Sequence, residues 1–191
     1  MAKKALGAIP AVFPMPVLMV AAYDENRKVN VMNAAWGMIS DMDQITLFID
    51  ADHKTTKNLK ATRAFTVSIA DVDHMDVADF FGIATGNKME DKFERTGYSA
   101  VKSDFVNAPI IEEFPVVMEC ELQEEIDTDT LHAIIGKIKN TSANEEVLAE
   151  NGKIDPSKVK ALIFDQFQNG YYTVGEKVGQ AWNAGAKLMK K

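Results

Sequence analysis

A basic segment between His53 and Arg63 stands out in an otherwise acidic chain. The chain has 191 residues, with 21 basic and 28 acidic side chains, which gives a net charge of −7. The segment holds no acid, and its basic and hydroxyl side chains include Lys54, Thr55, Thr56, Lys57 and Lys60. It lies where a helix is expected to begin, and free backbone N–H groups at a helix start attract phosphate. The segment therefore predicts either a cradle for a small anion or a solvated helix face.

Two further stretches offer surfaces on which a ligand could bind. Residues 30–37 read NVMNAAWG, so two amides, two alanines and Trp36 interrupt an expected strand. Small residues allow close approach to the backbone and an indole is flat and apolar; the alternative is a bulged strand with a packed Trp36. Thr85 and Gly86, followed by EDKF at 90–93, form the other stretch, whose alternative is a plain loop. A ring surface beside a phosphate cradle suits flavin mononucleotide (FMN).

Motifs for other chemistries do not occur in the sequence. Its histidines, His53, His74 and His132, are far apart, and it has neither C-x-x-C nor H-E-x-x-H, so we expect no metal site. It also has no Walker A loop, no G-x-S-x-G elbow and no strand-linked G-x-G-x-x-G. Cys120 falls on the apolar face of an expected strand, and we interpret it as inert packing.

The elements that must position these residues predict a mainly β (α+β) protein. Alternating or continuous apolar residues indicate strands at 17–22, 29–39, 44–50, 65–69, 118–122 and 131–139, and one or two at 162–174. Helices are expected at 55–62, capped by Thr55 or Thr56, and at 73–81, between a cap at Asp73 and a stop at Gly82. An apolar stripe predicts a C-terminal helix over 178–189, and 144–156 is expected to be an exposed loop. Such strands with inserted helices fit a closed antiparallel barrel.

Length and composition bound the class of protein. A chain of 21.1 kDa without a linker predicts one domain, residues 1–191. A pI near 5.0 argues against a nucleic-acid partner. The sequence has no run of ~20 apolar residues, so we expect no membrane partner. One cysteine cannot form an internal disulfide, and prolines interrupt the apolar N-terminal stretch that could mimic a secretory signal. These features predict a cytoplasmic location.

Five segments of the chain, in order, resemble the flavin reductase-like family, which includes the flavoredoxins. They are Pro16-Val17 with residues 30–36, His53-Lys54-Thr55 with Asn58, Thr85-Gly86 with Asp91-Lys92-Phe93, His132 with Gly136, and Tyr171-Tyr172 with residues 174–176. No single motif is strong, but their order extends over about residues 10–185. The resemblance implies an antiparallel FMN-binding split barrel with inserted helices, assembled as a homodimer.

The resemblance also assigns site residues. It implies that His53, Lys54, Thr55 and Asn58 hold the phosphate end of FMN. It places the ring beside the stretch that begins at Asn30 and contains Asn33, Ala34, Ala35 and Trp36, and near Thr85, Gly86, Lys92 and Tyr172. Asn33 stands where a Thr is common and Thr85 where a Ser is common, so ring contacts are expected to shift. His132 either faces the site or lies in the barrel.

The function implied is redox chemistry by a bound flavin. The flavin would accept electrons from NAD(P)H or from a redox protein partner, and hydride transfer needs no acid–base residue, so no catalytic side chain is assigned. Two alternatives stay open: an electron carrier of the flavoredoxin type without a small-molecule substrate, and a non-redox flavin-storage protein. In the expected homodimer, Trp36 and Tyr172 are candidates for the contact zone.

Overall fold

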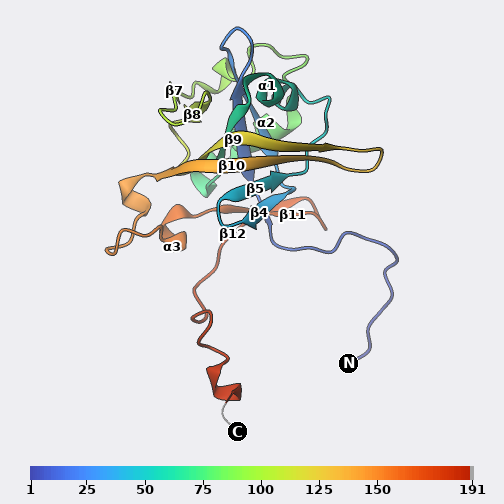
Figure 1. Ribbon diagram of the computed structural model, residues 1–191. Helices are drawn as coiled ribbons and strands as arrows, with labels where there is room; N and C mark the ends of the chain where they lie inside the picture. The colour runs from blue at the N-terminus through green and yellow to red at the C-terminus, as the bar shows by residue number, and fades with distance from the viewer. Residues whose placement is uncertain (190–191) are drawn as a thin grey trace.

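The computed structural model describes residues 1–189, which form three antiparallel sheets (Figure 1). The largest has the strand order β3-β2-β6-β9-β10-β5-β4. Its members are β2 (Leu18–Tyr23), β3 (Val29–Ala34), β4 (Gly37–Asp41), β5 (Gln44–Leu47), β6 (Ala64–Ile69), β9 (Val116–Asp127) and β10 (His132–Ala143). A second sheet consists of β1 (Met15–Pro16), β11 (Leu162–Asp165) and β12 (Gly170–Thr173). The third sheet pairs β7 (Ala100–Lys102) with β8 (Pro109–Ile111). The prediction of a mainly antiparallel β protein is confirmed.

Strand β2 lies at the centre of the molecule because both of its faces are apolar. Leu18 and Val20 point into a core with β5, β6, β9 and β10, whereas Val17 and Met19 belong to a second core under a helix and β11. All six residues of β2 are buried. A strand covered on both faces needs a continuous apolar run rather than alternation, which explains the sequence of this strand.

The β9–β10 hairpin extends well beyond the neighbouring strands (Figure 1). Gly136 stands at an irregularity of its register, where a Cβ atom would collide with the ring of Phe65. Glycine therefore allows β10 to pass close over the barrel core. His132 begins β10 at the far end of the hairpin and lies 2.7 Å from Asp127. His132 therefore does not lie inside the barrel, whereas its expected place at the site stays a prediction.

Two helices lie where the sequence predicts them, but their caps differ. Helix α1 (Lys54–Thr62) begins after His53, so Thr55 and Thr56 are inside the helix rather than at its cap. Helix α2 (Met75–Ile83) follows a 3-10 turn, η1 (Val72–His74), and the Asp71 carboxylate rather than Asp73 caps that turn. Gly82 does not stop α2, which continues one residue further.

The segment 144–156 is more ordered than the exposed loop predicted from its polarity. It contains the 3-10 turn η3 (Glu145–Val147) and leads to the short helix α3 (Pro156–Val159). Val147 and Val159 are buried against Val116 of β9. Two apolar side chains are enough to fix this mostly polar segment on the body.

The C-terminal helix predicted from the apolar stripe does not form. Residues 174–185 are irregular or turns, and only the 3-10 turn η4 (Ala186–Leu188) follows. Figure 1 shows this tail running away from the body, so its stripe does not pack against the rest of the chain. Short helices owe most of their stability to such packing, and Gly179 and Gly185 weaken this one further.

Among residues 1–189, no helix is both long enough and apolar enough to cross a membrane.

Candidate functional site

A cavity of about 140 Å³ opens at the N-terminal end of α1, between that helix, β3 and the loop that follows α2. It brings together eight of the thirteen residues predicted for the flavin site. These are Asn30, Asn33, His53, Lys54, Thr55, Thr85, Gly86 and Lys92. Residues from four separate parts of the sequence thus converge on one hollow, which we call the α1 cavity.

The start of α1 presents unsatisfied backbone donors to this cavity. The side chain of His53, the N-cap residue, makes no capping hydrogen bond, and the first turn holds no acidic residue. The buried hydroxyl of Thr55 accepts a hydrogen bond from Asn30 Nδ2 at 2.5 Å. A helix start without its own anionic cap is a ready site for phosphate.

Gly86 brings the loop after α2 close to this helix start. A Cβ atom on Gly86 would collide with Asn30 Oδ1 and lie 3.2 Å from Lys54 Cβ. The loop is also tied to the segment before α1, because Asn87 Nδ2 donates to the carbonyl of Asp52 at 3.0 Å. Sequence reasoning missed Asn87, although it stands next to the predicted Thr85-Gly86 pair.

Lys92 is a buried cation at the wall of the cavity. Its side chain is 4 % exposed, its Nζ donates to the carbonyl of Phe81 at 2.8 Å, and it lies 5.6 Å from the centre of the Phe81 ring. No ion pair to Lys92 occurs in the part of the chain that the structure describes. Burial lowers the pKa of this amine to about 8. An anion in the cavity would supply the missing counter-charge.

A second hollow of about 290 Å³ adjoins the α1 cavity, and the two share Met32, Asn33 and His53. Its remaining wall comes from Ala34, Ala35, Trp36, Phe48, Ile49 and Asp50. Ala35 and Trp36 link β3 to β4, which are the two edge strands of the large sheet, so the predicted single strand 29–39 is broken here. Methyl groups and an indole make this ring hollow suitable for a flat aromatic ligand.

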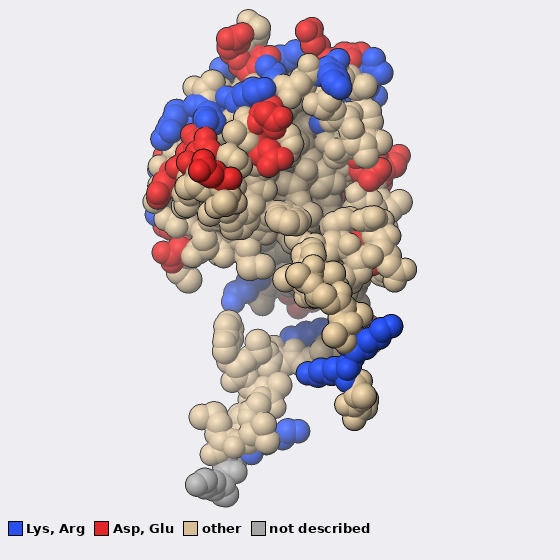
Figure 2. Space-filling view, turned by 90° about the vertical axis from the view of Figure 1, so that its right-hand side faces the viewer, with Lys and Arg blue, Asp and Glu red and all other residues tan. Residues whose placement is uncertain are grey.

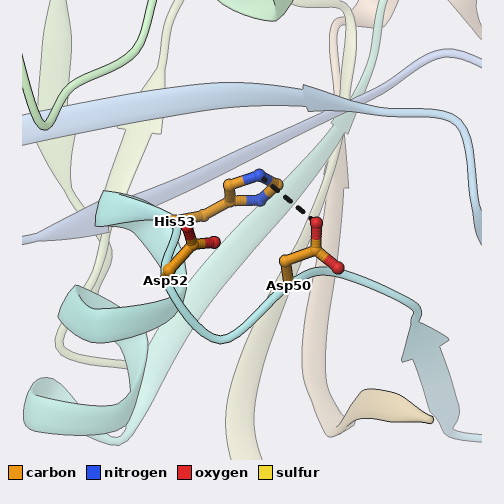
Figure 3. A group of neighbouring side chains, drawn as sticks. All are labelled: Asp50, Asp52 and His53. Carbon is orange, nitrogen blue, oxygen red and sulfur yellow. Dashed lines mark ion pairs between the residues drawn. The ribbon is translucent and has the colours of Figure 1, made fainter. Parts of the chain in front are cut away.

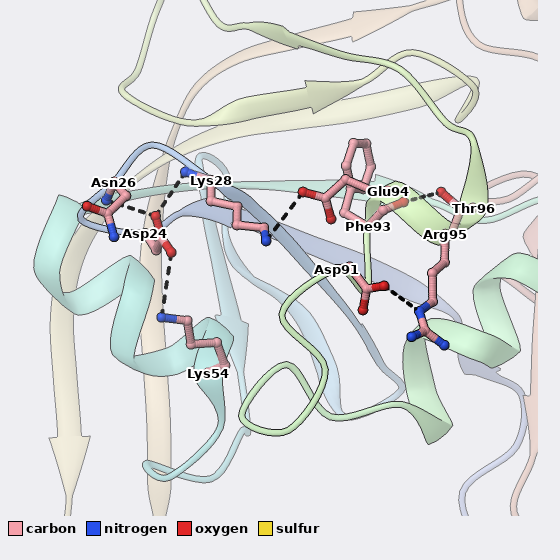
Figure 4. Close-up of polar contacts among 9 residues, drawn as sticks. All are labelled: Asp24, Asn26, Lys28, Lys54, Asp91, Phe93, Glu94, Arg95 and Thr96. Atoms are coloured by element: carbon pink, nitrogen blue, oxygen red, sulfur yellow. Dashed lines mark hydrogen bonds and ion pairs between the residues drawn. The ribbon is translucent and has the colours of Figure 1, made fainter.

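A third, polar hollow of about 380 Å³ lies on the other side of Lys54 and Gly86, beside the β2–β3 turn. Figure 4 shows its ion pairs: Asp24 with Lys54 at 3.8 Å, and Lys28 with Glu94 at 3.5 Å. Asp24 also accepts hydrogen bonds from the backbone of Asn26 and Lys28, so the turn that carries it is well fixed. Lys54 is therefore held between this turn and the α1 cavity.

Comparison with known proteins identifies the family. Residues 11–171 match the model of the flavin reductase like domain. The chain belongs to this family. The solved structure of the flavoredoxin of Desulfovibrio vulgaris (Miyazaki F) is 33% identical, covers 96% of this chain and 100% of its own, and superposes with a TM-score of 0.91.

Two further solved structures share the fold of this flavin reductase-like chain. A flavoredoxin from Methanosarcina acetivorans is 24% identical, with a TM-score of 0.90 over 99% of this chain and 100% of that one. An FMN-binding domain of a flavin reductases-like enzyme from Shewanella baltica OS155 is 19% identical, with a TM-score of 0.75 over 86% of this chain and 88% of that one. The predicted family and split-barrel fold are thereby confirmed.

Two predicted residues of this flavin reductase-like site do not line either hollow. Asn58 is buried on the inner side of α1, and its Nδ2 atom has no hydrogen-bond partner. Tyr172 lies in β12, where its ring contacts Phe13 edge-on with centroids 6.1 Å apart. Tyr171 is the one that reaches α2, through a 2.8 Å hydrogen bond to Asp79. Neighbouring residues of a strand point to opposite faces, so only one tyrosine of the pair could turn inward.

Tyr171 and Asn33 together fasten the ring hollow to α2. Asn33 Nδ2 donates to the carbonyl of Ala78 at 3.0 Å. The carboxylate of the next residue, Asp79, accepts a hydrogen bond from Tyr171. Burial, with the hydrogen bond to Asp79, raises the pKa of Tyr171 to about 12. The phenol therefore stays neutral and positions the wall of the site rather than exchanging protons.

The segment before α1 also gathers three possible metal ligands, Asp50, Asp52 and His53 (Figure 3). Their nearest ligand atoms lie within 4.8 Å of one another, and His53 Nε2 is 3.9 Å from Asp50. Both carboxylates are exposed to solvent. The spacing of the histidines gave no sign of this group, because its acids come from the same turn as His53.

Proposed function

We propose that the chain is an FMN-binding redox protein formed by residues 1–191 as one domain. The observation that carries this proposal is the uncapped start of α1, with Lys54 and the buried Lys92, directly beside the ring hollow with its alanines and Trp36. An anionic end and a flat aromatic end would thus be recognised by two adjoining surfaces. The FMN-binding domain from Shewanella baltica, which shares the fold, supports the choice of FMN.

Each group of residues has a defined part in this proposal. The backbone at the start of α1, Thr55 and Lys54 bind the phosphate, and Lys92 balances its charge. Ala34, Ala35 and Trp36 orient the ring and keep water from one side of it. When bound, FMN supplies the electron-transfer chemistry itself, while the protein binds and orients it.

The electron donor in this proposal is NAD(P)H or a redox protein, and no catalytic side chain is assigned. Similarity to a flavoredoxin at 33% identity favours an electron carrier as the second candidate. Oxidation of NADH or NADPH that depends on the holoprotein would identify the enzyme, whereas a holoprotein reducible only by a protein donor would identify the carrier. A bound flavin that no donor reduces would indicate storage.

The proposal also includes a homodimer in the cytoplasm. The dimer is motivated by exposed apolar side chains beside the ring hollow, namely Trp36, Met38, Ile39, Met42 and Phe48. The cytoplasmic location is motivated by the single, buried cysteine, Cys120, which suits a reducing compartment. Burial raises the pKa of its thiol to about 12, in line with inert packing.

The phosphate site is tested by titrating FMN and riboflavin against two lysine variants. Lys54→Met removes a cavity lysine, and Lys57→Met is the matched control, since Lys57 lies on the same helix but is exposed and bonded to Asn87. A charge-assisted hydrogen bond contributes about 1.5–3 kcal/mol, so Lys54→Met should weaken FMN binding roughly ten- to hundredfold.

Riboflavin has the ring but no phosphate, so its affinity should not respond to Lys54→Met. Lys57→Met should leave both ligands unchanged. If FMN and riboflavin lose the same affinity in Lys54→Met, the phosphate binds elsewhere, and a wild-type protein that binds neither ligand refutes the proposed function as a whole.

A further inference from the structure

An apolar groove of about 510 Å³ lies on the side of the body where the chain ends emerge. Its walls come from β1, β2, β4, β9 and β11, and include Leu18, Met38, Ile39, Met118 and Ile163. A volume of roughly 300–1,000 Å³ is typical of pockets that enclose a whole drug-sized ligand, so this groove has room for several side chains. We call it the β4–β11 groove.

The tail, residues 174–189, starts at this groove and then leaves it. Val174 lines the groove, yet Val178 and Trp182 are fully exposed, and Leu188 and Met189 are more than four-fifths exposed. Figure 1 shows the tail running clear of the body beyond β12. Among residues 1–189, the apolar stripe of the tail therefore packs against no other segment, although the tail begins beside an apolar groove.

Charge also matches the tail to the body. Residues 174–191 contain four lysines and one glutamate, which leaves 17 basic and 27 acidic residues in the rest of the chain. In Figure 2, lysines mark the protruding terminal segments, whereas the adjoining lower part of the body is largely free of charged side chains. Asp41 ends β4, whose Met38 and Ile39 line the groove, and no ion pair to Asp41 occurs among residues 1–189.

We propose that the tail of one copy of the chain binds in the β4–β11 groove of a second copy. Because each tail begins at its own groove, a two-fold axis between two copies would fill both grooves at once, as in domain-swapped dimers. The stripe of Val178, Trp182 and Leu188 provides the apolar anchors for this apolar groove. This inference specifies how the proposed dimer is held together, and it is independent of the proposed cofactor.

Cysteine cross-linking tests the exchange. One chain carries Asn183→Cys in the tail, next to the anchor Trp182, another carries Met38→Cys in the groove, and the two are co-expressed with different affinity tags. The native Cys120 is buried and does not interfere. After mild oxidation, we expect a disulfide-linked heterodimer, at a yield at least tenfold above that of a control pair with Val101→Cys. Val101 is exposed like Met38 but lies on β7, away from the groove.

A chain that carries both Asn183→Cys and Met38→Cys separates the remaining outcomes. If this double variant closes an internal disulfide at monomer mass and the heterodimer does not form, the tail folds back on its own groove and the proposal is wrong. It is equally wrong if neither bond exceeds the control. Light scattering on the unmodified protein must also give the mass of two chains, and a mass of one chain overturns the proposal. Flavin titration tests the proposed function separately.

Discussion

At the scale of single residues, the unpaired charge of Lys92 has a measurable consequence. Burial holds its pKa near 8, below the ordinary value of 10.5, so between these values the unfolded chain binds more protons than the folded one. The free energy of unfolding should therefore gain a contribution as pH rises from about 8 to 10.5, of at most about 3 kcal/mol. Urea denaturation of the flavin-free protein across this range measures it.

Lys92→Met removes this titration, so the pH dependence of the variant should differ from wild type by that contribution. Taking the difference cancels Cys120, whose raised pKa acts in the opposite direction. If the free energy of unfolding depends on pH in the same way in wild type and in Lys92→Met, the Lys92 amine is not desolvated in the folded protein. Bound FMN would favour the charged form, so its affinity for wild type should fall between pH 8 and 10.

Gly86 tests the close approach of two chain segments at the cavity. In Gly86→Ala the new methyl group collides with Asn30 Oδ1, so the Asn30 side chain must turn and its Nδ2 loses the hydrogen bond to the Thr55 hydroxyl. Losing the buried hydrogen bond between Asn30 and Thr55 should weaken FMN binding at least tenfold, and isothermal titration calorimetry measures this loss. Gly175→Ala is the matched control, because nothing lies within 4 Å of its added Cβ. Equal FMN affinities in the two variants would show that the close approach of Gly86 to Asn30 does not contribute to FMN binding.

At the scale of elements, Gly136 determines how closely β10 covers the barrel core. Gly136→Ala forces a methyl group into the ring of Phe65 and against Cys120 Cβ at 3.3 Å. Overpacking of this kind lowers the free energy of unfolding by about 1–3 kcal/mol. Urea titration should show this loss, whereas Lys139→Ala on the same strand, which removes an exposed ion pair to Glu121, should stay within about 0.5 kcal/mol. Similar midpoints for both variants would refute the tight contact.

Elements were predictable from the sequence where burial follows a local pattern. The alternation of Phe65, Val67 and Ile69, and the continuous apolar run of β2, correspond to strands in the structure. The prediction of a helix over residues 178–189 was wrong, because the apolar stripe shows only that one face would be apolar and not that another surface covers it. Caps were also wrong at Thr55 and Asp73, since several hydroxyl and acidic residues stand near each helix start.

The site was predictable as an ordered set of segments but not as a geometry. Asn58 lies on α1 and Tyr172 next to Tyr171, yet the twist of a helix and the pleat of a strand turn their side chains away from the hollows. Lys92 shares a cavity with Asn33, Lys54 and Thr55, so residues expected at the two ends of FMN line one hollow. Which side chain of a segment faces a ligand depends on tertiary packing, which no short pattern contains.

At the scale of the whole molecule, the exposed apolar surface around β4 bears on the state of assembly. Met38 and Met42 are 68 % and 95 % exposed, and Trp36, at the edge of the ring hollow, is 55 % exposed. An apolar surface of this kind, continuous with a binding site, is typical of a face covered by another protein. The same surface includes part of the β4–β11 groove, so a second copy would cover the groove and the side of the ring hollow together.

Light scattering at micromolar concentration should accordingly give twice 21.1 kDa for the wild-type protein. Met38→Glu places an unpaired carboxylate in the covered face, and desolvating it should weaken the dimer by at least about 2 kcal/mol, roughly thirtyfold in dissociation constant. Val101→Glu introduces the same charge on β7, where the side chain is 44 % exposed, and should leave the mass unchanged. Because the interface is apolar, wild-type dimers should persist in 1 M salt, unlike a contact held by ion pairs. A wild-type mass of one chain, or equal effects of the two glutamates, would show that β4 faces solvent.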